Sequence, residues 1–238
     1  MAFSVIKGKP ASFQILPLGD AAIVVKFGDT IDRELHHNVQ ALENYFAHHC
    51  LQGMIEHVPA YATVTIYYDP LQRPFHDLDQ ELRGIIAELA AAPEADPRIV
   101  EIPVSYGGEF GPDLEFVARH NSLKPEDVIQ IHSTPDYLVY MIGFAPGFPY
   151  LGGMSQRIAA PRRDSPRLQI PVGSVGIAGS QTGVYPIETP GGWQLIGRTP
   201  IELFRPREIP PTRLRAGDVV RFRPITIEEY NSSRAKSR

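Results

Sequence analysis

The sequence predicts an α+β protein of two domains followed by a short tail, and two observations support this division. In the first hundred residues, apolar positions with helical spacing lie between β-rich runs, which is typical of a small α/β domain. Beyond residue 100 the helical periodicity nearly disappears, and this part holds 15 of the 20 glycines and 16 of the 23 prolines. Short strands joined by Gly/Pro turns are typical of a β-barrel or sandwich. We therefore expect domains at residues 1–97 and 98–230, with a polar, flexible tail at 231–238.

The first domain has the element order of a ferredoxin-like split βαβ fold. Helices are expected from Asp29 or Thr30 to about residue 46, and over residues 76–92, because their apolar residues fall on one face. The β-rich runs are residues 21–27, 54–59, 62–68 and 99–104. The order β-α-β-β-α-β predicts two helices on one face of an antiparallel sheet. Two prolines favour a linker at 91–97. The strand at 99–104 follows this linker, so the sequence leaves open which of the two domains contains it.

The second domain begins with two short predicted helices, at residues 113–121 and 125–131, and continues as strands. Asp113 is the expected cap of the first helix, and Pro125 suits the first turn of the second. The expected strands are residues 137–142, 169–172, 175–178, 183–187, 193–196 and 218–222.

Residues 141–154 form a loop in which glycines and prolines alternate with the aromatic residues Phe144, Phe148 and Tyr150. Glycine permits positive φ and close approach, whereas proline, here including Pro146, fixes φ, so the loop is shaped. Its rings either form the wall of a binding pocket or cap the core of a barrel.

Several polar residues are candidates for a site. His132 is a general base, a substrate hydrogen-bonding group or a structural histidine. Glu109 and Asp113 lie in a Gly-rich turn after Tyr106, where they line a pocket or hold Mg²⁺, and for Asp113 we favour helix capping. The remaining candidates are arginines that suit an oxyanion and groups in Gly-flanked turns: Arg162, Arg163, Arg167, Gln181, Thr182 and Trp193.

Composition excludes several other classes. The net charge is −4, although residues 157–223 hold 11 arginines against 5 acidic residues, and no nucleic-acid-binding motif accompanies them. No apolar run is long enough for a membrane span and the first residues lack the apolar core of a signal peptide, so we expect a cytoplasmic protein. Adjacent histidine pairs and a single cysteine do not form a metal site. The chain also contains no Walker-type phosphate loop and no Ser-His-Asp set.

Four consecutive strings of sequence resemble the B-subunit family of prokaryotic 5-oxoprolinase. The strings are Met141–Met154, Pro161–Arg167, Ile170–Pro186 and Pro190–Pro200. The family includes the Kip-type inhibitor of a sporulation histidine kinase, and the module is similar to one half of the allophanate hydrolase and urea amidolyase-associated proteins. The resemblance is strong from Val104 to Arg223 and weak from about Gly19, so it covers most of the chain.

The resemblance implies a cyclophilin-like barrel in the second domain and an ATP-dependent opening of 5-oxo-L-proline to L-glutamate. It implies a complex with the A and C subunits, in which ATP, with or without Mg²⁺, binds in the complex and this chain is inactive alone. The site assigned on this basis has His132, Glu109 and Arg163 as catalytic residues. The binding residues are Tyr106, Phe144, Pro146, Phe148, Tyr150, Arg162, Arg167, Gln181, Thr182 and Trp193. The alternative is a regulatory protein that binds the dimerisation and phosphotransfer helices of a sensor histidine kinase.

Overall fold

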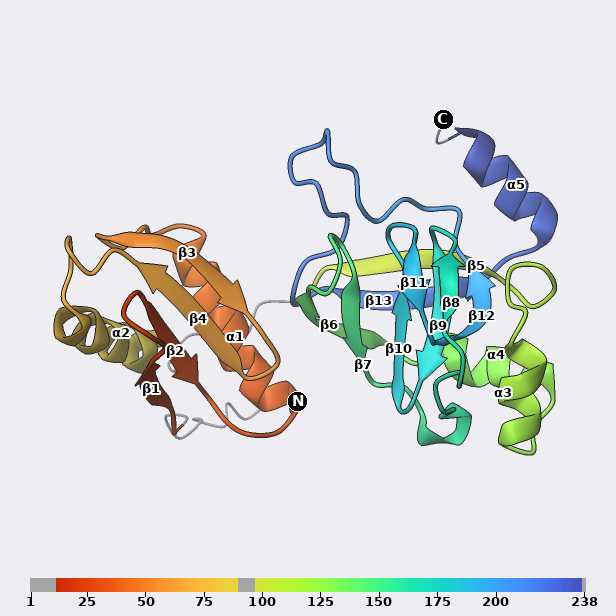
Figure 1. The fold of residues 1–238 in the computed structure, drawn as a ribbon, viewed down its shortest axis with the longest axis horizontal. Helices are drawn as coiled ribbons and strands as arrows, with labels where there is room; N and C mark the ends of the chain where they lie inside the picture. The colour runs from red at the N-terminus through yellow and green to blue at the C-terminus, as the bar shows by residue number, and fades with distance from the viewer. Residues whose placement is uncertain (1–11, 90–96, 237–238) are drawn as a thin grey trace, which may run out of the picture. The chain divides into compact units, whose positions relative to one another are not determined.

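The computed structural model describes residues 12–89 and 97–236, which form two compact units, the second of them beginning at residue 97 (Figure 1). The predicted linker at 91–97 lies almost entirely outside the described residues. None of the described helices is both long and apolar enough to cross a membrane.

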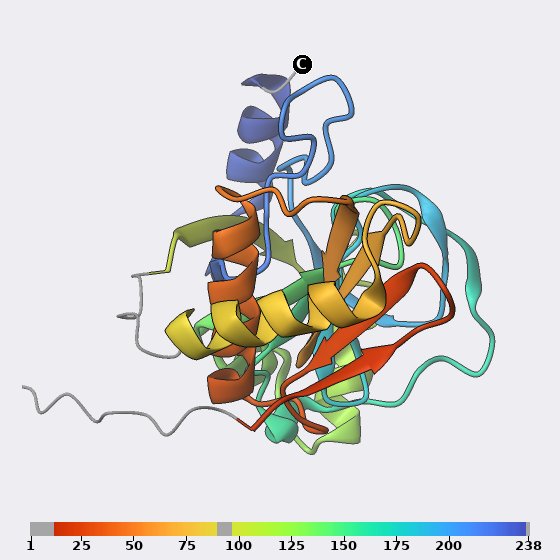
Figure 2. The same cartoon turned by 90° about the vertical axis from the view of Figure 1, so that its left-hand side faces the viewer.

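The first unit is a four-stranded antiparallel sheet with two helices on one face (Figures 1 and 2). Its elements are β1 (Gln14–Pro17), β2 (Ala22–Lys26), α1 (Arg33–Phe46), β3 (Met54–Pro59), β4 (Thr63–Tyr68) and α2 (Phe75–Leu89). The sheet order is β1-β2-β4-β3. Alternate strand residues such as Ile23, Val64 and Ile66 are buried in one core with Leu42 of α1 and Leu82 of α2, as the apolar spacing predicts.

The N-cap of the first helix lies two or three residues later than predicted. Asp32 is its N-cap, and its carboxylate accepts hydrogen bonds from the backbone N–H groups of Glu34 (2.8 Å) and Leu35 (3.2 Å). These bonds satisfy donors that have no partner within the helix, so Asp32 is a better start than Asp29 or Thr30.

The strand at residues 99–104 does not complete the first sheet, contrary to the predicted order. It forms β5 (Ile99–Tyr106), which pairs with two strands of the second unit. The fourth strand of the first sheet is β1, which pairs with β2. The predicted ferredoxin-like connectivity is therefore not confirmed. Strand β1 has only four residues and ends in proline, so it carries little strand signal of its own.

The second unit is a closed barrel of seven strands in the order β10-β7-β6-β13-β5-β12-β9. The remaining elements are α3 (Leu114–His120), α4 (Pro125–Ser133), β6 (Tyr137–Ile142), β7 (Pro149–Gly152), η1 (Gln156–Ile158), β8 (Arg167–Ile170), β9 (Ser174–Ala178), β10 (Gln181–Val184), β11 (Thr189–Gly191), β12 (Gln194–Arg198), β13 (Val219–Pro224) and α5 (Ile227–Lys236). The main core includes Ile102, Val139, Ile177, Ile196 and Val220, one from each of five strands. Strands β8 and β11 pair only with each other and form a separate two-stranded sheet.

The end of the chain is helical where the sequence analysis expected a flexible tail from residue 231. Helix α5 extends to Lys236. Thr226 and Glu229 exchange hydrogen bonds at its start, with the backbone N–H of each donating to the side chain of the other (3.0 and 3.2 Å). Tyr230 packs its ring against Phe110, 4.3 Å away between centroids. This capping box and the buried ring anchor a segment whose composition is otherwise polar.

Candidate functional site

An aromatic layer, formed by Phe148, Tyr185 and Trp193, covers the outer wall of the barrel. The ring of Phe148 contacts those of Tyr185 and Trp193 edge to face, at centroid distances of 5.6 and 5.7 Å. The layer belongs to a core cluster separate from the barrel interior. Gly176 and Gly183 are cross-strand partners beneath it, and a Cβ at Gly183 would lie 2.8 Å from Phe148 and 3.2 Å from Trp193. The bare glycine backbone thus lets the rings lie against the barrel.

The loop after β6 presents one further ring to solvent. Phe144 is 69% exposed, and its centroid lies 5.5 Å from that of Phe148. Its φ is +67°, a left-handed conformation that is strained for a residue with a large side chain. Backbone hydrogen bonds close the turn around it, from Gly143 to the carbonyl of Phe148 and from Phe148 to that of Ala145 (both 3.0 Å). Strain held in this way is typical of a functional loop.

Asp113 organises an arginine cluster beside the aromatic layer. This residue is 5% exposed, and its carboxylate accepts hydrogen bonds from Arg163 (3.1 Å), from Arg167 (2.8 Å) and from the backbone N–H of Leu195 (2.7 Å). Asp113 is the N-cap residue of α3, as predicted, but its side chain makes no capping hydrogen bond to the helix. The two arginines draw the carboxylate into an ion-pair cluster, which is the stronger interaction.

The cluster retains unused donors. Nη1 of Arg167 is buried and has no hydrogen-bond partner within the described part of the chain. Arg162 is exposed. Burial raises the pKa of Tyr185 to about 12, and the charges of Arg162 and Arg167 act in the opposite direction, which places both arginines near the aromatic layer. The arrangement is a positively charged edge beside aromatic rings, which suits a small anion with a flat apolar face.

Two hydrogen bonds hold the segment that carries these arginines against the residues on either side of Trp193. The backbone N–H of Arg163 donates to the carbonyl of Gly192 (2.7 Å). The side-chain amide of Gln194, which is buried, donates to the carbonyl of Pro161 (2.9 Å). The sequence analysis did not single out Gln194, because its partner lies 33 residues away and no local pattern marks the contact.

His132 lies in a sealed network inside the barrel unit. It is fully buried, with Nδ1 2.8 Å from the hydroxyl of Tyr106 and Nε2 2.8 Å from the hydroxyl of Thr182. Thr182 donates its own proton to the carbonyl of Gly176 (3.0 Å). His132 must then donate from Nε2 to Thr182, and Nδ1 must accept from Tyr106. Every group in this sealed network is paired when the imidazole is neutral.

Burial lowers the pKa of His132 to about 3, which agrees with a neutral ring. Burial likewise raises the pKa of Tyr106 well above its usual value. Because both ring nitrogens are engaged and the side chain has no exposed surface, the geometry favours the structural alternative for His132 over proton transfer.

The structure therefore divides the predicted site into two groups. The sealed network contains Tyr106, His132 and Thr182, and the outer wall carries Phe144, Phe148, Tyr150, Arg162, Arg163, Arg167 and Trp193. Three predicted site residues are in neither group. Glu109 is exposed in the turn after β5, Pro146 is exposed in the loop after β6, and Gln181 is the first residue of β10. Across residues 12–89 and 97–236 there is no cluster of three or more His, Cys, Asp or Glu side chains suited to a metal ion.

These features define a class of protein: an α/β unit followed by a closed barrel with an arginine and aromatic cluster on its outer wall. Residues 13–214 match the family described as carboxyltransferase domain, subdomain C and D, and the chain belongs to it. It is 52% identical over 235 residues to the B subunit of 5-oxoprolinase from Bacillus subtilis (strain 168), covering 94% of this chain and 98% of the relative. It is 42% identical over 208 residues to the B subunit of 5-oxoprolinase from Haemophilus influenzae, covering 87% and 96%. The chain thus belongs to the family of 5-oxoprolinase B subunits, which confirms the resemblance.

A solved structure shares this fold. The crystal structure of TTHA0988 aligns with 86% of this chain and 40% of its own length, at a TM-score of 0.76 and 36% identity.

Proposed function

We propose that this chain is the B subunit of an ATP-dependent 5-oxoprolinase and acts with the A and C subunits. The observation that carries the proposal is the 52% identity to a 5-oxoprolinase B subunit across 98% of that relative's length. The outer-wall cluster supports it, because its arginines and aromatic rings match a small cyclic amide with a carboxylate.

The reaction hydrolyses the lactam C–N bond of 5-oxo-L-proline, so one water is consumed and the ring nitrogen leaves as the amino group of L-glutamate. Coupling to ATP transfers its γ-phosphoryl group to the amide oxygen and releases ADP. That first water attacks the activated carbon and the C–N bond breaks, which leaves the γ-carboxyl group of glutamate as an acyl phosphate. A second water then hydrolyses the acyl phosphate to L-glutamate and phosphate. Negative charge develops on the oxygens of the reacting centre, and fixed cationic donors lower that barrier. Arg162, Arg163 and Arg167 are the donors on this chain.

The arginine cluster of this chain is not a complete ATP site by itself. The chain lacks a Walker-type loop, and the phosphate-binding groups in the cluster are guanidinium groups alone. We propose that ATP, with any Mg²⁺ that accompanies it, binds in the complex, and that the arginine edge faces the site contributed by a partner subunit.

The test is 5-oxoproline-dependent formation of ADP and glutamate by this chain alone and with the A and C subunits. Activity is expected only in the three-part mixture. Arg162→Gln removes a guanidinium from an exposed position and is expected to lower kcat by about 10²-fold, the loss typical of one transition-state donor. Arg223→Gln is the matched control, since Arg223 is an exposed arginine at the end of β13. Equal activity of the two variants would remove Arg162 from the site, and no activity in any mixture would remove the enzyme proposal.

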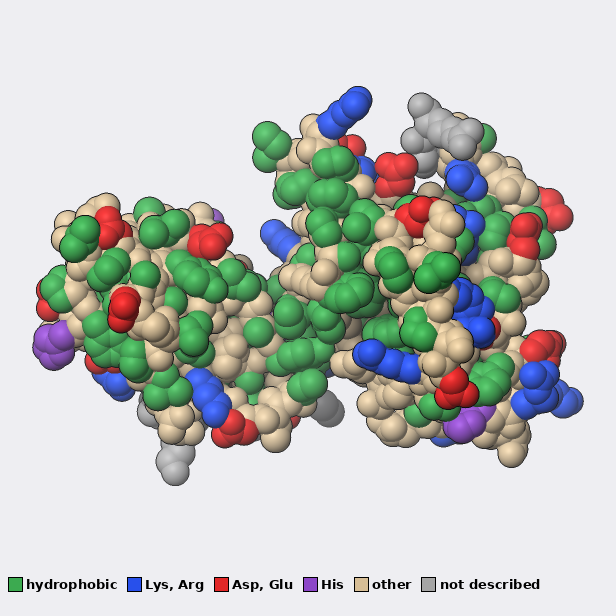
Figure 3. Space-filling view, in the orientation of Figure 1, with side chains coloured by type: hydrophobic (Ala, Val, Ile, Leu, Met, Phe, Trp, Pro, Cys, Tyr) green, Lys and Arg blue, Asp and Glu red, His purple; other side chains and the backbone are tan. Residues whose placement is uncertain are grey.

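A second candidate function is inhibition of a sensor histidine kinase, and the open face of the first sheet favours it. Leu16, Val24, Thr65 and Val58 are partners in register across all four strands, so they share the face without helices. Leu16 and Val58 are each 44% exposed, and Ile55 nearby on β3 is 70% exposed. Figure 3 shows hydrophobic side chains over this sheet. Such a surface suits the apolar face of a partner helix.

This candidate is tested by histidine kinase autophosphorylation in the presence of the full chain. Ile55→Asp combined with Val58→Asp is expected to abolish inhibition and leave 5-oxoprolinase activity of the complex unchanged. Leu71→Asp is the control, because Leu71 is 96% exposed in the same unit but lies outside the sheet. Absence of inhibition by the unmodified chain would reject the candidate without affecting the enzyme proposal.

We also propose a ferredoxin-like description of the first unit in a permuted form, with β1 in the place of the final strand. The order β1-β2-β4-β3, with helices after β2 and β4, supports it. The cyclophilin-like description of the barrel remains a proposal from the family resemblance.

A further inference from the structure

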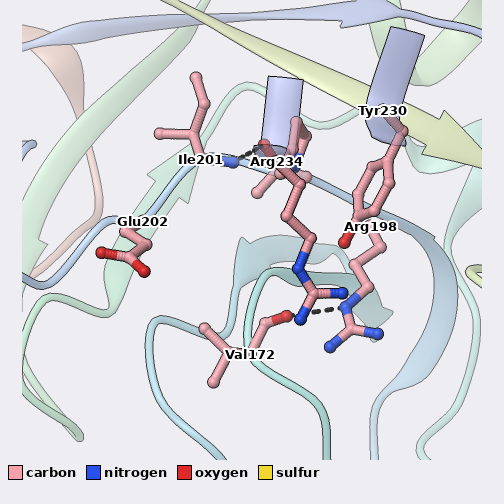
Figure 4. Close-up of a pocket in the computed structure, with 8 residues that line it drawn as sticks. Val172, Arg198, Ile201, Glu202, Tyr230 and Arg234 are labelled. Carbon is pink, nitrogen blue, oxygen red and sulfur yellow. Dashed lines mark hydrogen bonds between the residues drawn. The ribbon is translucent and has the colours of Figure 1, made fainter. Parts of the chain in front are cut away.

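A second cluster of arginines lies at the far end of β12 from Trp193. A cavity of about 240 Å³ opens there, and the residues lining it include Val172, Arg198, Glu202, Tyr230 and Arg234 (Figure 4). Arg198 is the last residue of β12, and Tyr230 and Arg234 are one helical turn apart on α5. The cavity therefore depends on the helix that the sequence analysis did not expect.

The two guanidinium groups point into the same space. Nε of Arg198 donates to the carbonyl of Val172 (2.8 Å), which fixes the side chain and leaves its terminal nitrogens toward the cavity (Figure 4). Neither Arg198 nor Arg234 forms an ion pair with any residue in the described ranges 12–89 and 97–236. Glu202 lines the cavity but its carboxylate points away from both arginines (Figure 4). Two neighbouring cations without a counter-charge repel each other and favour a bound anion.

Tyr230 provides an independent sign of a ligand. Its side chain is 2% exposed, and its ring is held against Phe110. Its hydroxyl makes no hydrogen bond within the part of the chain that the structure describes, and Figure 4 shows it on the side of the cavity where the arginines lie. The oxygen is not one of the buried side-chain atoms that lack a partner, so it opens onto the cavity, where a bound group can accept its proton.

We propose that Arg198, Arg234 and Tyr230 form a binding pocket for an oxyanion, either a phosphate or a carboxylate group. Two guanidinium groups supply paired N–H donors to the oxygens, and the phenol supplies a third, neutral donor. The pocket is separate from the outer-wall cluster, and the inference does not rest on the proposed function.

The test is calorimetric titration of the full chain at constant ionic strength, with inorganic phosphate in one arm and L-glutamate in the other. We expect saturable binding in at least one arm, and the arm that binds identifies the source of the oxyanion. Arg234→Gln is expected to weaken that binding at least about tenfold, and Tyr230→Phe, which removes only the hydroxyl, by about threefold to tenfold. Arg119→Gln, at an exposed arginine of α3, is the matched control and should bind as the wild type does.

The proposal would be overturned if the wild type bound neither phosphate nor glutamate. Binding that Arg234→Gln and Arg119→Gln weaken equally would also overturn it, since the effect would then come from net charge. Both test variants lie on α5 and break none of the hydrogen bonds described above for the barrel, so loss of fold does not confuse the result. Circular dichroism of each variant checks this directly.

Discussion

The sealed network inside the barrel unit and the arginine cluster on its outer wall are both made of residues that the sequence marks as candidates, yet they differ in one respect. Around His132 each donor has an acceptor, and no part of the imidazole is exposed. Around Asp113 the carboxylate is fully engaged, but Arg167 keeps a buried N–H group without a partner in the described part of the chain. A complete network stabilises the fold, whereas an incomplete one can bind something else. Substitutions in the two groups test that distinction, beginning with the largest effect.

Replacing His132 should cause the largest loss of stability. His132→Leu leaves the buried hydroxyl of Tyr106 without its acceptor and removes a ring that packs 4.6 Å from that of Phe222. We expect the free energy of unfolding to fall by about 3–5 kcal/mol, as for other losses of buried networks. Denaturant unfolding followed by the fluorescence of Trp193, the single tryptophan, measures it in this unit. His120→Leu, at an exposed position of α3, is the control.

The two roles of His132 make different predictions for activity. If the residue is structural, activity of the assembled complex will follow the folded fraction of His132→Leu. A fully folded variant that has lost activity would show instead that His132 transfers a proton, and the comparison between the two polar groups would fail.

The pH dependence of stability should distinguish the sealed network as well. His132 has a pKa of about 3 when folded, below its usual value of 6.5, because burial disfavours the charged form. The unfolded chain therefore binds the proton more readily, so this contribution to stability is complete above pH 6.5 and is lost as the pH falls toward 3. We expect the unfolding midpoint of the wild type to fall over that window more steeply than that of His132→Leu. Parallel curves would contradict a neutral buried His132.

Much of the fold could be predicted from local sequence, whereas the partners of the site residues could not. Strand 137–142 and strand 54–59 were predicted with the ends that the structure shows, because alternation and turn residues act within a few positions. Asp113 meets Arg163 across 50 residues, and His132 meets Thr182 across the same separation. No periodicity reports such contacts. The helix after Thr226 is different, since its Thr-x-x-Glu spacing was visible and was missed.

Neutralising Asp113 should have an intermediate effect. Asp113→Asn keeps the shape and an acceptor for Leu195, but it removes the charge that holds Arg163 and Arg167. Both arginines are partly exposed, so water screens part of the loss, and we expect about 1–3 kcal/mol of destabilisation. Activity of the complex should fall further than stability explains, because the arginine donors lose their orientation. Asp164→Asn changes an exposed carboxylate in the same segment and is the control.

Substitutions at Phe144 should have the smallest effect on stability and separate strain from binding. Phe144→Ala and Phe144→Gly both remove the exposed ring, but only glycine adopts a φ of +67° without strain. We expect the glycine variant to be more stable than the alanine variant by about 1 kcal/mol. If the ring forms part of the site, both variants will lose activity to the same extent in the assembled complex, despite their different stabilities. Activity that instead follows stability would show that the loop matters only for folding. Full activity in both would place the functional surface on the arginine edge alone, so that the strain in the loop would have no part in the reaction.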